Sequence, residues 1–82
     1  MILIKLENGA EIPCDLFLEV EGEDIVARSK ALGFIFRTQI GAEVDILDIA
    51  YEGIKFFFET YINKQGEGAL NHWLDNRGIK HP

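Results

Sequence analysis

One segment, from Ile46 to about Lys64, constrains the fold of this chain more than any other. Asp45 is a suitable N-cap residue and Gln65-Gly66 follow the segment, so a helix is predicted. At about 100° per residue, five polar residues of the segment fall within one arc of roughly 80°; they are Asp48, Glu52, Lys55, Glu59 and Asn63. Almost all of the remaining circumference is apolar or small, whereas an ordinary surface helix has an apolar stripe of only about 100°. Other elements are therefore predicted to cover this helix on several sides.

Residues 2–14 have the pattern of a β-hairpin, because apolar residues alternate on both sides of an Asn-Gly turn signal. A three-residue loop, 7–9, with Gly9 in the left-handed conformation, would put the apolar residues of both strands on one face. It would also place Lys5 opposite Glu11, a favourable cross-strand pair. A two-residue loop would instead set Leu6 opposite Glu11 and Ile4 opposite Pro13, so the three-residue loop is predicted.

Two further strands are predicted, near 16–21 and 34–40. In residues 16–21 the apolar Leu16, Leu18 and Val20 alternate with Phe17, Glu19 and Glu21. Residues 34–40 are rich in aromatic and β-branched residues. Two interpretations remain open for residues 24–32: a short helix capped by Asp24, or a strand over 25–29. The helix is preferred.

A second helix is predicted at about 67–77. Leu70, Trp73 and Leu74 are spaced to form one buried face. Gly78 occupies the position of a left-handed C′ residue, and Ile79 after it could pack back on Leu74 in a Schellman ending.

Strands followed by helices predict an α+β fold. A small N-terminal antiparallel sheet, made of the hairpin 2–14 and the strands near 16–21 and 34–40, should pack against the two C-terminal helices at about 46–64 and 67–77.

The length and composition indicate a single compact domain, residues 1–82. The chain of 82 residues is shorter than the typical domain of ~100–150 residues, and its apolar content of 48% is too high for a disordered tail. It has no signal-peptide segment and no apolar run near the ~20 residues that span a bilayer. The lone Cys14 fits a reducing compartment. A cytoplasmic protein is expected.

No residue pattern predicts an enzyme. Cys14 has no basic neighbour that would lower the pKa of its thiol, and His72 has no second histidine at i+4. Residues 66–68 read Gly-Glu-Gly at a helix start, but they lack the preceding strand and the lysine of a phosphate-binding loop. No catalytic residue, no cofactor and no metal site is expected.

The chain is acidic, and its charges are grouped. Fourteen acidic residues against eight Lys and Arg give a net charge of −6. Residues 7–27 contain seven acids and residues 38–54 contain four, with no Lys or Arg in either segment. Because binding to nucleic acid or to an anionic membrane needs clustered cations, neither is expected. The acids expected to contact a basic partner protein are Glu19, Glu21, Glu23, Asp24, Glu43 and Asp45.

The spacing of these acids suggests what the partner would be. A strand with Glu19, Glu21 and Glu23 on one face would space the carboxylates by about 6.7 Å, roughly twice the axial phosphate step of one DNA strand. In size, charge and lack of catalytic motifs, the chain resembles small acidic phage-encoded inhibitors, anti-CRISPR proteins among them. The resemblance rests on no sequence motif. It implies an inhibitor that docks on a nucleic-acid-binding surface of a partner; the other interpretation of the acids is a solvated outer face.

A homo-oligomer is the alternative. If one sheet and the last helix cover two sides of helix 46–64, a third apolar stripe needs cover; it consists of Leu47, Tyr51, Phe58 and Ile62. Large exposed apolar patches usually mark interfaces. The stripe is therefore predicted to lie in a homodimer or partner interface, unless strand residues near Phe34 and Phe36 wrap around the helix and bury it.

Overall fold

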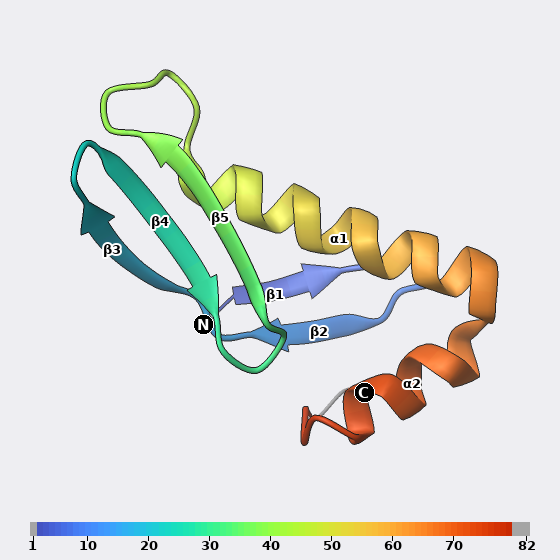
Figure 1. Cartoon of the computed structure of the whole chain (residues 1–82). Helices are drawn as coiled ribbons and strands as arrows, with labels where there is room; N and C mark the ends of the chain where they lie inside the picture. The colour runs from blue at the N-terminus through green and yellow to red at the C-terminus, as the bar shows by residue number, and fades with distance from the viewer. Residues whose placement is uncertain (1, 80–82) are drawn as a thin grey trace.

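The computed structural model describes residues 2–79, in which five strands are followed by two helices (Figure 1). The strands are β1 (Ile2–Lys5), β2 (Glu11–Cys14), β3 (Phe17–Glu21), β4 (Asp24–Ser29) and β5 (Phe34–Gln39), and the helices are α1 (Ile46–Gln65) and α2 (Glu67–Asp75). The predicted α+β class is confirmed. The Cα trace is elongated, with extents of 40 × 22 × 18 Å.

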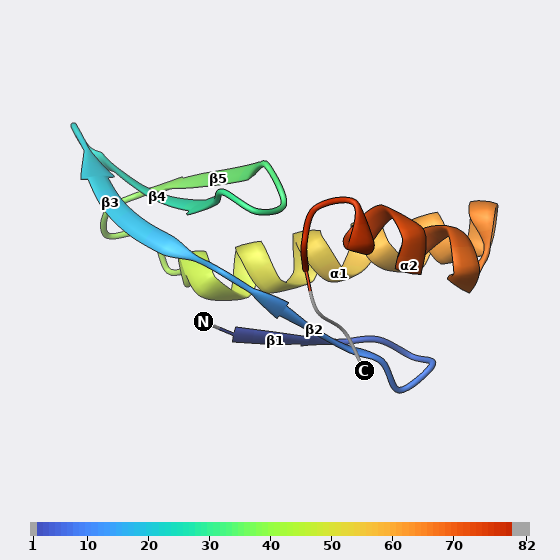
Figure 2. The same cartoon turned by 90° about the horizontal axis from the view of Figure 1, so that it is seen from below.

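The strands form two antiparallel sheets, one of β1 and β2 and the other in the order β3–β4–β5. Only Asp15 and Leu16 separate β2 from β3, so one bent stretch of chain contributes a strand to each sheet (Figure 2). The bend turns the β1–β2 hairpin away from the three-stranded sheet, and α1 lies between the two. The predicted N-terminal sheet is thus divided in two.

The hairpin has the predicted three-residue loop. The backbone N–H of Leu6 donates to the carbonyl of Ala10 at 2.9 Å, and Gly9 has a φ of 90°. Lys5 lies opposite Glu11, as expected. Because side chains alternate along a strand, this register directs the apolar residues of both strands to one face, where Ile4 is fully buried.

The preference for a helix over residues 24–32 is wrong, because β4 occupies Asp24–Ser29 as the central strand of its sheet. Gly22, with a φ of 62°, is the first residue of a two-residue turn between β3 and β4, the type II′ arrangement that suits a hairpin. Val26 and Ala27, which point to opposite faces, are both at 0% exposure. Burial on both faces gives a continuous apolar run, in which the alternation typical of a half-exposed strand is hidden.

Helix α1 is covered on three sides, which accounts for its apolar circumference. It packs against β4 and β5, against β1, and against α2. Phe58, at 0% exposure, belongs to a core cluster that includes Ile4 and Ile12 of the hairpin. On the same side, the Tyr51 hydroxyl accepts a hydrogen bond from the backbone N–H of Lys5 at 3.1 Å.

Helix α2 ends in the predicted Schellman geometry, although the helix itself ends at Asp75 rather than near residue 77. The N–H of Ile79 donates to the carbonyl of Leu74 at 3.1 Å, and the N–H of Gly78 donates to the carbonyl of Asp75 at 3.0 Å. Gly78 has a φ of 69°, and Ile79 is buried in the same cluster as Leu74. These bonds satisfy the last carbonyls of the helix and fold its end back on the core.

Candidate functional site

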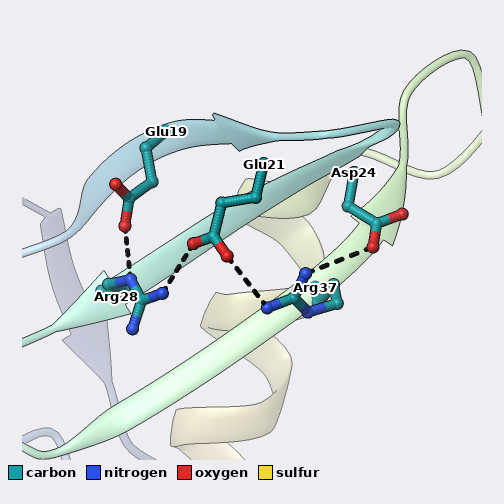
Figure 3. A network of polar contacts seen from close by, with 5 residues as sticks. All are labelled: Glu19, Glu21, Asp24, Arg28 and Arg37. Carbon is teal, nitrogen blue, oxygen red and sulfur yellow. Dashed lines mark hydrogen bonds and ion pairs between the residues drawn. The ribbon is translucent and has the colours of Figure 1, made fainter.

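The outer face of the three-stranded sheet carries a chain of ion pairs (Figure 3). Glu19 pairs with Arg28, whose Nη2 lies 2.6 Å from Oε2 of Glu21. The other oxygen of Glu21 lies 3.3 Å from Nη2 of Arg37, and Nη1 of Arg37 lies 3.2 Å from Asp24. The register explains the arrangement, because residues directly opposite one another on antiparallel strands project from the same face.

These five residues, the sheet-face network, largely compensate one another's charge. Three carboxylates and two guanidinium groups leave a charge of −1. Hydrogen bonding to Arg28, the larger effect, and then to Arg37 holds the pKa of Glu21 below its ordinary value. The pKa values of both arginines are raised by their carboxylate partners. The network therefore offers a partner far less negative charge than its acids alone would suggest.

The predicted acidic residues divide into two groups. Glu19, Glu21 and Asp24 belong to the sheet-face network, whereas Glu23, Glu43 and Asp45 are exposed outside it. The structure therefore does not place the six on one free surface. Glu23 does not share the strand face of Glu19 and Glu21, because β3 ends at Glu21 and Glu23 lies in the β3–β4 turn.

A different set of carboxylates gathers at one end of the molecule, where the β3–β4 turn, the loop 40–45 and the start of α1 meet (Figure 1). A hydrogen bond of 2.9 Å from the N–H of Ile40 to the carbonyl of Glu23 joins the turn to the loop. We call this set the acidic end; its members are Glu23, Glu43, Asp45 and Asp48, all of them exposed. Within residues 2–79, none of the four takes part in an ion pair.

Two members of the acidic end also stabilise α1. Asp45 is the N-cap and accepts a hydrogen bond from the N–H of Leu47 at 2.9 Å. Asp48 lies in the first turn, where a negative charge interacts favourably with the helix dipole. The side-chain carboxylates of Glu43 and Glu23 accept no hydrogen bond and form no ion pair within the described residues, and so remain available to a partner.

The predicted apolar stripe is not a continuous exposed surface. Phe58 is fully buried by the chain's own hairpin and helices, so the expectation that it needs a second molecule to cover it is wrong. Tyr51 and Ile62 are half-buried, and Leu47 is 38% exposed. The error arises because the β1–β2 hairpin, separated from the main sheet, provides the third cover.

The exposed apolar side chains lie elsewhere. On β3, Phe17, Leu18 and Val20 are 54%, 47% and 65% exposed. On α1, Phe56 is 73% exposed and borders an open apolar depression that Tyr61 also lines. The sequence pattern places Phe56 on the helix but does not show that its side is the one left uncovered.

Arg28 and Arg37 are not among the site residues predicted from the sequence. A helix over 24–32, as predicted, would not set these arginines beside the acidic strand. Period two along 24–29 was the available signal, since it sets Asp24 and Arg28 on one strand face. A two-residue turn at Gly22 would then bring that face beside Glu21.

A small polar cluster near the bend of the chain holds Asp15 by several hydrogen bonds. Asp15 accepts hydrogen bonds from the Ser29 hydroxyl at 2.8 Å and from the backbone N–H groups of Lys30 and Ala31 at 3.2 and 3.3 Å. Burial acts to raise the pKa of Asp15, but these hydrogen bonds outweigh it and the pKa is lowered. Burial raises the pKa of the Cys14 thiol, which is only 1% exposed, so the thiol is neither ionised nor accessible.

Residues 2–79 contain no group of three or more His, Cys, Asp and Glu residues arranged to hold a metal ion. His72 is exposed on α2. Neither helix in the described range has the length and apolar character needed to cross a membrane.

Comparisons of this chain with protein-family models, with curated proteins and with solved structures found no match.

Proposed function

We propose that this chain is a non-catalytic protein-binding module whose acidic end docks on a basic surface of a partner protein. The observation that carries the proposal is the division of the acids into two groups. The acids of the sheet-face network are compensated by arginines, whereas the acidic end holds four exposed carboxylates without an ion pair in the described residues. Charge left unpaired at one end of an elongated molecule favours a defined orientation on a cationic surface.

The partner best suited to this surface is a nucleic-acid-binding protein, since such proteins present clustered Lys and Arg where phosphates bind. Carboxylates that occupy those positions would exclude the nucleic acid, so the module would act as an inhibitor. This matches the resemblance in size and charge to small phage-encoded inhibitors. The carboxylates proposed to make the contact are Glu23, Glu43 and Asp48. The carboxylate of Asp45 is not included, because it is already engaged in capping α1.

The test compares captured proteins for three forms of the chain. The acidic-end variant carries Glu23→Gln, Glu43→Gln and Asp48→Asn and keeps the N-cap Asp45. A matched control removes the same number of charges elsewhere, at Glu11, Glu59 and Glu67, each changed to Gln.

Each form is immobilised, and the proteins it captures from a bacterial lysate are quantified by mass spectrometry. We expect a basic protein bound by the wild type and the control, lost to the acidic-end variant, and released as the salt concentration rises. When the captured protein is purified and bound to DNA, addition of the wild-type chain should displace the DNA. Equal capture by all three forms, or binding that withstands high salt, would overturn the proposal.

A further inference from the structure

Strand β3 is an edge strand that the rest of the described chain leaves open. It pairs only with β4, and neither view shows a strand or helix along its outer side (Figures 1 and 2). Phe17, Leu18 and Val20 are about half exposed or more. An edge of this kind has unpaired backbone N–H and C=O groups that can accept another strand.

The usual protection of an edge strand is weak here. Edge strands are commonly blunted by charged side chains, proline or bulges. Within residues 2–79 the only strand proline, Pro13, lies in β2, and β3 pairs with β4 residue for residue without a bulge. The charges of Glu19 and Glu21 are largely compensated by Arg28 on β4 and Arg37 on β5, and these ion pairs draw the two side chains away from the open edge.

The turn between β3 and β4 determines which backbone groups face outward. In a two-residue hairpin, the residues that flank the loop form a hydrogen-bonded pair, here Glu21 and Asp24. Hydrogen-bonding direction alternates along a strand, so Glu19 and Glu21 direct their backbone groups toward β4. Leu18 and Val20 therefore direct theirs toward the open edge.

We propose that two copies of this chain associate by antiparallel pairing of their β3 strands, with Leu18 opposite Leu18 of the second copy. This register sets Val20 opposite Leu16, so every pair on the α1 side of the sheet is apolar. On the other side it sets Glu19 opposite Phe17 within β3 and, just outside the strand, Glu21 opposite Asp15, which is already hydrogen-bonded to Ser29. Together the two three-stranded sheets form one sheet of six strands around a two-fold axis.

The neighbouring registers are excluded by charge. A two-fold axis at Glu19 would set Glu19 against itself, and an axis at Val20 would set Glu19 against Glu21 of the second copy. Like charges directly opposite each other destabilise a sheet. A two-fold axis at Phe17 would pair only Phe17 with itself inside the strand. Of the registers that pair at least three residues of β3 with β3 of the second copy, only the one centred on Leu18 sets no carboxylate of one strand against a carboxylate of the other.

The exposed side chains of β3 favour a second copy over a basic strand from another protein. The two carboxylates on β3 are largely compensated by Arg28 and Arg37, so the edge has little charge to attract a cationic segment. Its apolar residues instead match their own symmetry mates. Each copy carries a net charge of −6, so repulsion opposes the dimer and added salt should strengthen it. Added salt should instead weaken the docking of the acidic end on a basic partner, because it screens the attraction between opposite charges.

Sedimentation equilibrium at low and high salt tests the pairing. We expect the wild type to be a dimer whose dissociation constant falls as salt is added. Val20→Lys should remain a monomer of 9.3 kDa with an unchanged Tm, because a lysine at the edge blocks pairing without touching the core. Phe56→Lys, the matched control on α1, should dimerise like the wild type. A wild-type monomer at millimolar concentration in high salt, or a dimer that survives Val20→Lys, would overturn the proposal.

Spin labels test the register. Labels at Leu18→Cys should face each other on residues with Cα atoms about 5.5 Å apart, whereas labels at Val20→Cys should be offset by about 14 Å along the strand. The wild type treated with the same reagent controls for Cys14, which is buried. Stronger dipolar coupling at residue 18 than at residue 20 is expected, and equal or reversed coupling would overturn the Leu18 register.

Discussion

Gly53, in the middle of α1, lies directly against the ring of Phe36 on β5. A Cβ atom at position 53 would be 2.5 Å from Cε1 of Phe36 and 3.0 Å from its Cζ. No real side chain tolerates the shorter distance, so the missing Cβ allows α1 to approach the sheet this closely. Gly53 weakens the helix locally and strengthens its contact with the sheet.

Gly53→Ala is therefore expected to destabilise the protein, even though alanine is the better helix former by about 1 kcal/mol. Displacing the Phe36 ring from between the two core clusters should cost about 1–3 kcal/mol, the usual range for overpacking. Urea unfolding measures the net change in the free energy of unfolding.

The double variant Gly53→Ala/Phe36→Leu isolates the contact. The double variant should recover part of the free energy of unfolding that Gly53→Ala loses, so the coupling free energy between the two positions should be clearly non-zero. A Gly53→Ala protein more stable than the wild type would mean that the ring moves aside at little cost.

Phe58→Ala should destabilise the protein by about 3–5 kcal/mol, the usual cost of truncating a fully buried phenylalanine. The side chain is at 0% exposure, and its ring packs edge-on against Trp73 at 6.0 Å between centroids. Phe56→Ala, two residues earlier and 73% exposed, should change the free energy of unfolding by no more than about 0.5 kcal/mol.

Thermal unfolding of the two variants separates a core position from an interface position. If Phe58→Ala kept the wild-type Tm and lost self-association instead, Phe58 would belong to an interface after all.

The features predicted correctly from the sequence are those fixed by neighbouring residues. The hairpin loop follows from Gly9, the start of α1 from Asp45, and the Schellman ending from Gly78. Each position makes its hydrogen bonds within a few residues of the chain, so the local sequence contains the whole signal.

The features missed depend on contacts between distant residues. Whether 24–29 is a helix or a strand is decided by β3 and β5 on its two sides, because Asp24 and the residues after it satisfy local rules for both. The same error hides the sheet-face network, since Arg28 meets Glu19 only in a strand. The division of the sheet at Asp15 likewise depends on Ser29, fourteen residues away.

Asp15→Asn should destabilise the protein by about 1–2 kcal/mol, because Asp15 accepts charge-assisted hydrogen bonds from the segment that joins β4 to β5. An amide has only one acceptor oxygen in place of two. Asp45→Asn is the matched control: asparagine is as good an N-cap as aspartate, so the change should be small.

Chemical denaturation of the two variants measures the difference. Equal decreases in the free energy of unfolding for Asp15→Asn and Asp45→Asn would show that Asp15 stabilises the fold no more than an exposed helix cap does.

The acid dependence of stability should be reduced in Glu21→Gln. The pKa of Glu21 lies below its ordinary value of 4.5 because Arg28 and then Arg37 donate hydrogen bonds to the carboxylate. A lowered pKa in the folded state means that the stabilisation is complete above the unfolded-state pKa and is lost as the pH falls through the folded-state value. The wild type should therefore be more stable than Glu21→Gln at neutral pH, and the two stabilities should converge as the pH falls through the range in which carboxyl groups titrate.

Two controls accompany this comparison. Glu23→Gln, which removes a neighbouring carboxylate outside the network, should follow the wild-type curve. Added salt should narrow the difference in stability between Glu21→Gln and the wild type. Free energies of unfolding measured from neutral to acidic pH would contradict this prediction if the wild-type and Glu21→Gln curves ran parallel.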